Sequence, residues 1–266
     1  MKMDMNGDGK GEYETEYPEC FSQDSFNTFS YVKCPSGTVV SSAEGIPLAD
    51  LNQTQAISLC EGIGGHLISN DEWMTIARNI ELVPENWSGG IVGSGYLFKG
   101  NHLFDDIHLG LKDGFTDMTG VSKRTFTLSN GEVVWDLSGN ATEILSDTIL
   151  QKDQPEVWNT YDGTLLSASF WNGSVGYSDN FYLNSSNLGN TTLEVKDLFL
   201  SNLDYNQSHG LGSVFTLTDI NSTSDLNHIF LRSYGGSITG GLLSLRLQLL
   251  PYSHFSSTGF RCVIVP

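Results

Sequence analysis

Residues 69–80 read SNDEWMTIARNI, and this stretch has both the start and the apolar face of an amphipathic helix. Ser69 is an N-cap residue with Glu72 three positions later, which is the capping-box pattern. The apolar residues that follow recur at helical spacing: Trp73, Ile76, Ala77 and Ile80. We therefore predict a helix here whose apolar side packs into a core.

Another helix is predicted just before it. Asn52 and Gln55 have the same capping-box spacing. An apolar face follows at Ala56, Ile57, Leu59 and Cys60. Glycines then end the helix, at Gly62, Gly64 and Gly65.

Beyond these helices the pattern changes to strands. Two alternating runs, RTFTL (124–128) and EVVWD (132–136), flank Ser129-Asn130-Gly131. Asn-Gly between such runs is a strong hairpin signal. Residues 145–205 carry scattered aromatic residues without a helical period, so we expect an irregular insert there. Two early helices followed by short antiparallel strands and long loops predict the α+β class.

Length and charge limit the function classes. The chain has 266 residues and a formal net charge of −18. A surface this acidic repels phosphate backbones and anionic lipids, so we expect no nucleic-acid partner and no membrane insertion. No stretch approaches the roughly 18–20 apolar residues of a membrane span, and the first residues lack the apolar core of a signal peptide. We expect residues 1–18 to be a flexible acidic leader and residues 19–266 to form the domain.

The last 41 residues, 226–266, differ from the rest of the chain. All 31 acidic residues lie at or before Asp225, so this segment carries a charge of +3 and the remainder −21. Its leucines alternate with other residues, which predicts a half-buried strand: Leu243, Leu245, Leu247 and Leu249. The outward side would present Arg246, Gln248 and Leu250, followed by a loop at 251–255. This composition is typical of a protein-binding patch, and an ordinary terminal strand with a loop is the alternative.

Four cysteines, Cys20, Cys34, Cys60 and Cys262, allow three pairings into two disulfides. Cys20 and Cys34 are close enough in sequence to close a local loop. Cys60 and Cys262 would then close a loop of about 200 residues, which stabilises the fold by about 4–5 kcal/mol in the chain-entropy model. Four reduced thiols are the alternative. Eight Asn-x-Ser/Thr triplets constrain the location only weakly, because many arise by chance in a chain of this composition.

Several segments resemble the formylglycine-generating-enzyme family, in the family's order along the chain. They are GGHLIS (64–69) with EW (72–73) and IAR (76–78), NGEVVWDLSGN (130–140), GGS (235–237) and GFRC (259–262). The similarity covers roughly residues 46–144 and 205–266. It departs after Asn140, where the aromatic half of the family's VWDLSGNVWEW is absent, and at Ile238, where the family has Trp. The resemblance implies a C-type-lectin-like α+β domain of this family's subtype.

The resemblance does not extend to the chemistry of the copper-dependent enzyme. That enzyme places two cysteines shortly before the GFR motif, whereas residues 244–248 and the loop after them contain none. Serine or leucine cannot replace a thiol as a soft copper ligand. The six histidines show no paired ligand spacing, and no Ser/His/Asp or paired-carboxylate pattern is present. We expect no enzyme activity, no catalytic residues, no metal and no cofactor; a metal-dependent oxidoreductase of this type is the alternative.

The variable proteins of diversity-generating retroelements use the same scaffold. This chain is more similar to them in two segments, LISNDEWMTIARNIE and LSNGEVVWDLSGN. In those systems, codons just before GFR are copied with errors at template adenines, and AAC codons then become residues other than Gln, Lys, Met, Trp or Glu. Residues 232–258 contain none of these except Gln248, which we expect to be a fixed position.

This second resemblance implies a ligand-binding display protein on a virion or a cell surface. Its partner would be a protein or glycan receptor on another cell or particle, and a Cys60–Cys262 disulfide would bracket the variable segment. A structural virion or surface subunit is a further alternative, whereas the sugar-binding motif of calcium-dependent lectins is absent. The expected contact residues are Ser233, Tyr234, Ser237, Ile238, Thr239, Leu242, Arg246, Leu250, Tyr252, His254, Phe255 and Ser256.

Overall fold

The computed structural model describes side chains in nine stretches of the chain. They are residues 48–99, 123–139, 141–155, 191–201, 209–212, 214–216, 225–233, 241–254 and 258–264. Six short strands outside these stretches are described as backbone: β1 (Lys2–Asp4), β2 (Phe21–Gln23), β3 (Phe29–Tyr31), β4 (Thr38–Val40), β9 (Trp158–Asn159) and β10 (Phe181–Tyr182).

Both predicted helices are confirmed. α1 (Gln53–Gly62) begins at Asn52, whose side chain accepts the backbone N–H of Gln55 while the Gln55 side chain accepts the backbone N–H of Asn52. α2 (Asn70–Glu81) begins with the same reciprocal pair at Ser69. These bonds satisfy donors that the first turn of a helix otherwise leaves without partners.

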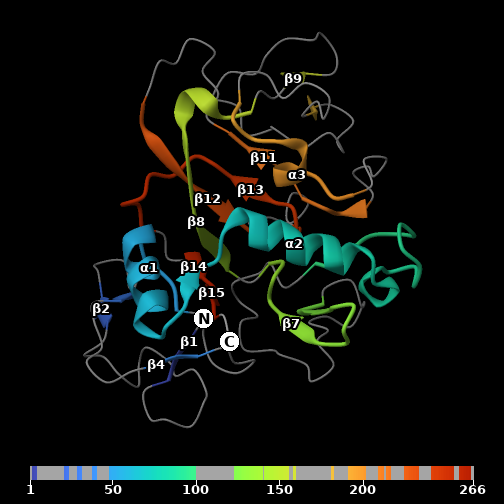
Figure 1. The fold of residues 1–266 in the computed structure, drawn as a ribbon, viewed down its shortest axis with the longest axis horizontal. Coiled ribbons are helices and arrows are strands. Elements are labelled where there is room, and N and C mark those ends of the chain that lie inside the picture. The colour runs from blue at the N-terminus through green and yellow to red at the C-terminus, as the bar shows by residue number, and fades with distance from the viewer. Residues whose placement is uncertain are drawn as a thin grey trace.

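A mixed sheet of five strands forms the centre of the described structure (Figure 1). Its strands are β8 (Thr142–Leu150), β11 (Val214–Phe215), β12 (Asn227–Arg232), β13 (Leu245–Arg246) and β14 (Thr258–Phe260). Their order across the sheet is β11-β13-β12-β8-β14. β12 is antiparallel to both β13 and β8, whereas β11 is parallel to β13 and β14 is parallel to β8. The C-terminal segment therefore contributes two inner strands, β12 and β13, and one edge strand, β14.

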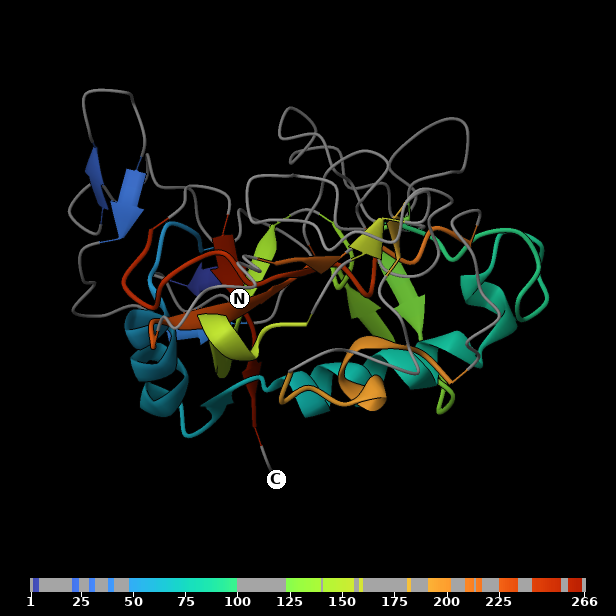
Figure 2. The same cartoon turned by 90° about the horizontal axis from the view of Figure 1, so that it is seen from above.

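Neighbouring residues of the central strands enter two different hydrophobic clusters, because successive side chains of a strand point to opposite faces. Leu145 and Phe230 pack in one cluster with α2. Ile144 and Leu231 pack in a second cluster with α1. Figures 1 and 2 show α2 lying across one face of the sheet and α1 beside one end of it. The two helices thus pack against side chains that point to opposite faces of the sheet.

The remaining strands form short antiparallel pairs. The predicted hairpin is confirmed as β6 (Thr125–Thr127) paired with β7 (Val133–Trp135). β15 (Cys262–Val263) pairs with β5 (His66–Leu67), β1 pairs with β4, β2 with β3, and β9 with β10. A short helix, α3 (Val195–Leu198), and two 3₁₀ turns, η2 (Pro84–Asn86) and η4 (Gln151–Asp153), complete the described elements. The α+β class is therefore confirmed, and none of the helices in the described residues is long and apolar enough to span a membrane.

The segment predicted to be irregular, residues 145–205, begins inside β8, so its predicted start is wrong. β8 is one of the inner strands, and its sequence TEILSDTIL lacks the alternation by which a half-buried strand is recognised. Three residues of the predicted leader 1–18, those of β1, pair with β4. Most of the leader lies outside the described residues.

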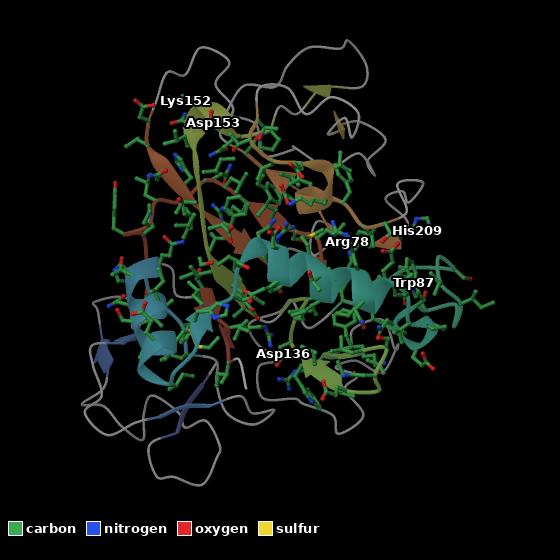
Figure 3. The ribbon with its side chains drawn as sticks, in the orientation of Figure 1. Arg78, Trp87, Asp136, Lys152, Asp153 and His209 are labelled. Atoms are coloured by element: carbon green, nitrogen blue, oxygen red, sulfur yellow. A yellow bond between two sulfur atoms is a disulfide. The ribbon has the colours of Figure 1, made fainter. Side chains whose placement is uncertain are left out.

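The WDLSGN segment is fixed beside the hairpin by a buried ion pair. Arg124 Nε donates to Asp136 Oδ1 over 2.6 Å, and its Nη2 contacts the second carboxylate oxygen. The hydrogen bond with Asp136 raises the pKa of Arg124. Figure 3 shows Asp136 beside β7. Lys152 and Asp153 lie just after the C-terminal end of β8. This arrangement is structural, because Arg124 and Asp136 are both buried.

Candidate functional site: the C-terminal strip

The C-terminal strip, residues 226–266, runs through the middle of the sheet. Its β12 and β13 are neighbours, with Leu231 opposite Arg246 and Arg232 opposite Leu245. On its other side β13 pairs with β11, which precedes the strip in sequence. The strip is therefore an integral part of the core.

One side of the strip strand is anchored as predicted for three of the four leucines, whereas Leu249 is half-buried against the cluster that contains α1. Leu243, Leu245 and Leu247 are fully buried in the cluster that contains α2. The indole Nε1 of Trp73 on α2 also donates to the Leu242 carbonyl over 3.0 Å. Leaving a buried amide or carbonyl without a partner is costly, so this bond fixes the backbone as well as the side chains.

The other side of the strand is half-buried. Arg246 occupies one row across the five strands, and every other member of that row is apolar and buried: Phe215, Leu231, Ile144 and Phe260. Its Nε donates to Gln248 Oε1 over 3.0 Å. Gln248, expected to be a fixed position, therefore orients the guanidinium of Arg246.

A tight turn follows the strand and presents the most exposed of the large hydrophobic side chains in the described strip. The Ser253 amide donates to the Leu250 carbonyl over 2.9 Å. Tyr252, inside this turn, is 69% exposed. The turn is tied to α1, because the backbone amide of Gln53 donates to the Pro251 carbonyl over 3.1 Å. Tyr252 is thus an exposed aromatic side chain on an anchored backbone.

The end of the strip is joined to the N-terminal half of the domain. The predicted Cys60–Cys262 disulfide is present and links α1 to β15. The Arg261 guanidinium lies 2.7 Å from the carboxylate of Glu143 in β8. Burial raises the pKa of Glu143, and the charge of Arg261 opposes that shift. A disulfide and an ion pair therefore follow the turn.

The start of the strip holds a buried arginine that the sequence analysis did not identify as structural. Arg232 is fully buried, and its guanidinium donates to Asn70 Oδ1 over 2.6 and 3.0 Å, to the Leu243 carbonyl over 2.9 Å and to the Asp197 carbonyl over 2.6 Å. Burial lowers its pKa to about 9, and Asp147 and Asp197 oppose the shift. The group therefore stays charged at neutral pH and joins β12, α2 and α3.

Two predicted contact residues are wrong, because the structure buries them. Leu242 and Ser233 are both 0% exposed. Ser233 has a positive φ of 63°, and its hydroxyl accepts the Gly139 N–H over 2.7 Å and donates to the Gly139 carbonyl over 3.1 Å. It is a link to the WDLSGN segment, and it offers no surface to a partner.

The other predicted residues divide into three groups. Tyr252 and His254 are exposed, and Arg246 and Leu250 are half-buried. The predicted contact residues Tyr234, Ser237, Ile238, Thr239, Phe255 and Ser256 lie outside the described residues, as do Cys20 and Cys34.

A cavity of about 260 Å³ lies at the N-terminus of α2, and Phe230 is the residue of the strip that lines it. Its charged lining is mainly acidic: Asp71, Asp147, Glu194, Asp197 and Lys196. Burial raises the pKa of Asp147, although a hydrogen bond from the Asn70 amide opposes the shift. Lys196 lies within 4 Å of three of these carboxylates. Among the described residues, no three His, Cys, Asp or Glu side chains are arranged to hold a metal ion.

Comparison with known proteins identifies no family for this arrangement. No protein-family model matches the chain, and no curated protein matches it significantly.

Proposed function

We propose that this chain is a ligand-binding display protein. In this proposal it is a C-type-lectin-like domain of the formylglycine-generating-enzyme subtype, and its C-terminal strip is a diversified surface that binds a protein or glycan receptor. The observation that carries the proposal is the division within the strip. Leu243, Leu245 and Leu247 are buried, whereas Tyr252 is largely exposed on a turn attached to α1.

This division separates stability from variation. Shortening a buried leucine to alanine costs about 2–5 kcal/mol, whereas most exposed substitutions change stability by less than about 0.5 kcal/mol. Exposed positions of the strip can therefore vary while the strand beneath them stays folded. The disulfide and the Arg261–Glu143 ion pair hold the end of the strip during such variation.

The chemistry of the strip suits recognition of a macromolecule. Tyrosine and arginine are frequent energetic anchors of interfaces because they combine a large contact area with hydrogen bonding. Tyr252 is such a residue, and Arg246 is oriented by Gln248. The strip also carries no acidic residue on a strongly acidic protein. In this proposal the protein acts by binding at the surface of a virion or cell, without catalysis or a cofactor.

Sequencing the gene and its flanks in sibling isolates tests this function. We expect variation at Arg246, Leu250, Tyr252 and His254, and constancy at the buried positions of the same strip: Arg232, Ser233, Leu242, Leu243, Leu245 and Leu247. We also expect a reverse-transcriptase gene and a near-copy of the final coding segment nearby. Variation spread evenly along the chain would overturn the proposal.

A further inference from the structure

The imidazole of His254 lies between two groups at the start of α1. Its Nε2 is 3.1 Å from Asn52 Nδ2, and its Nδ1 is 3.3 Å from the Asp50 carbonyl oxygen. His254 follows the turn that carries Tyr252. The ring therefore forms a second attachment between this turn and α1, beside the Gln53–Pro251 backbone bond.

The capping box fixes which atom of Asn52 faces the ring. Asn52 Oδ1 accepts the Gln55 amide over 3.0 Å, so the same side chain directs its Nδ2 donor toward His254. His254 Nε2 must then accept, and the ring proton resides on Nδ1, which donates to the Asp50 carbonyl. One neutral tautomer makes both bonds.

Protonation removes this match. A doubly protonated imidazole has no acceptor, so an N–H of His254 would face an N–H of Asn52 across 3.1 Å. Rotating the Asn52 amide would restore the contact only by breaking the N-cap bond to Gln55. We propose that His254 is a proton-sensitive latch, which holds the Tyr252 turn against α1 when neutral and releases it when protonated.

The charged and titratable groups around the latch are few on the described segments that meet it. Asp50 contacts the ring through its carbonyl. The first turn of α1 is uncharged, and the helix's acid, Glu61, is eight residues from its start, about 12 Å along the axis. The turn itself carries Tyr252, and β12 carries His228, which is buried and whose pKa burial lowers. A change in the charge of His254 itself therefore alters the contact between its Nε2 and Asn52 Nδ2 directly.

This inference rests on the proposed function for its biological meaning. A latched turn presents Tyr252 in a fixed position, which reduces the entropy lost on binding a receptor. An unlatched turn presents the same side chain on a mobile backbone. Sibling proteins without histidine at position 254 would lack this response to acid.

Backbone ¹⁵N relaxation of the full chain at pH 8 and pH 5 tests the latch without any receptor. For the wild type we expect the Tyr252 amide order parameter to fall from about 0.85 to about 0.6 or lower. His254→Gln places an amide oxygen near the former Nε2 and should keep the high value at both pH values. His254→Ala should show the low value at both.

His66→Gln is the matched control, because His66 is also an exposed histidine at a capping box, that of α2. This variant should respond to pH as the wild type does. The proposal is overturned if the His254 ring titrates while the Tyr252 order parameter stays constant, or if the ring remains neutral down to pH 5. A failed receptor-binding assay beside a working latch would count against the proposed function alone.

Discussion

The N-termini of α1 and α2 have the same local structure, but the histidine beside each one contacts a different kind of group. Each begins with a capping box, and each box contacts a histidine. On α2 the imidazole of His66 meets the carboxylate of Glu72 at 2.7 Å, so protonation strengthens the contact. On α1 the imidazole of His254 meets the amide donor of Asn52, so protonation breaks it. The same motif therefore gives pH responses of opposite sign.

The long-range attachments of the two helix starts differ as well. Asn70, the first residue of α2, accepts two hydrogen bonds from buried Arg232 and donates its amide to Asp147. Gln53, the first residue of α1, is also buried, and its side-chain amide donates to the Leu145 and Asp147 carbonyls of β8. Its backbone N–H donates to the exposed Tyr252 turn. Both helix starts are therefore fixed to the core, and the start of α1 also supports a surface turn. Presentation of the turn should depend on the start of α1.

Removing the α2 attachment should have the largest effect. We expect Arg232→Met to lower the free energy of unfolding by about 3–5 kcal/mol, because Asn70 and the carbonyls of Leu243 and Asp197 lose buried donors and Asp147 loses its countercharge. Urea denaturation at pH 7 measures this. Arg232→Lys, which keeps the charge but not the planar fork, should lose less. A loss below about 1 kcal/mol in Arg232→Met would show that the core network is dispensable.

The disulfide attaches the other end of α1 to the strip, and its removal should have the next largest effect. We expect Cys60→Ser with Cys262→Ser to cost about 2–5 kcal/mol, because the bond joins residues 202 apart in sequence. Hydrogen exchange should show the amides of α1 losing protection before those of α2. Equal loss of protection in both helices would mean that the two helix starts unfold as one unit.

Local patterns in the sequence were sufficient to predict the structure wherever near neighbours determine it. The capping residues and the Asn-Gly hairpin correspond to observed elements. The predicted alternation of leucines holds for Leu243, Leu245 and Leu247 and is wrong for Leu249, which is half-buried against the α1 cluster. The Cys60–Cys262 pairing was predicted from the expectation that Cys20 and Cys34, which are close in sequence, pair with each other. The Cys60–Cys262 disulfide is present.

The features that sequence reasoning missed depend on distant contacts. Arg232 meets Asn70 across 162 residues, and His254 meets Asn52 across 202 residues. Ser233 is buried through its positive φ and its bonds to Gly139, which no periodicity indicates. The exposure of Tyr252 could be predicted from its place in a Pro-containing loop, but its attachment to α1 could not. Of the predicted contact residues that the structure describes, Tyr252 and His254 are exposed, whereas Ser233 and Leu242 are buried.

Substitutions at the two N-caps separate capping from latching. Asn52→Ala and Ser69→Ala should each cost about 0.5–2 kcal/mol, because each removes an N-cap acceptor. Only Asn52→Ala should lower the Tyr252 order parameter at pH 8. Thermal unfolding and ¹⁵N relaxation of both variants measure the two effects. If Ser69→Ala loosened the turn equally, the link would be a general effect of stability.

Asn52→Asp tests the sign of the contact directly. Aspartate is a good N-cap residue, so stability should change by less than about 0.5 kcal/mol. A carboxylate oxygen would replace the Nδ2 donor, and protonated His254 would then be attracted to it. The pH response of the Tyr252 turn should therefore invert, with greater order at pH 5 than at pH 8. An unchanged direction of response would contradict the proposed hydrogen-bond polarity.

A small effect on stability is also expected at the α2 capping box. Burial raises the pKa of Glu72, but hydrogen bonds from Ser69 and His66 outweigh this and lower the pKa below its ordinary 4.5. A carboxylate with a lowered pKa stabilises the fold above the unfolded-state value and loses that contribution as the pH falls through the folded-state value. Glu72→Gln keeps a capping side chain without the charge, so it should cost less than about 1 kcal/mol at pH 7, since solvent screens this partly exposed pair. In urea titrations the difference should shrink as the pH falls below 4.5 and through the folded-state pKa of Glu72. A difference that did not change with pH would assign the effect to capping geometry, and α2 would then lack the charge-dependent response that distinguishes it from α1.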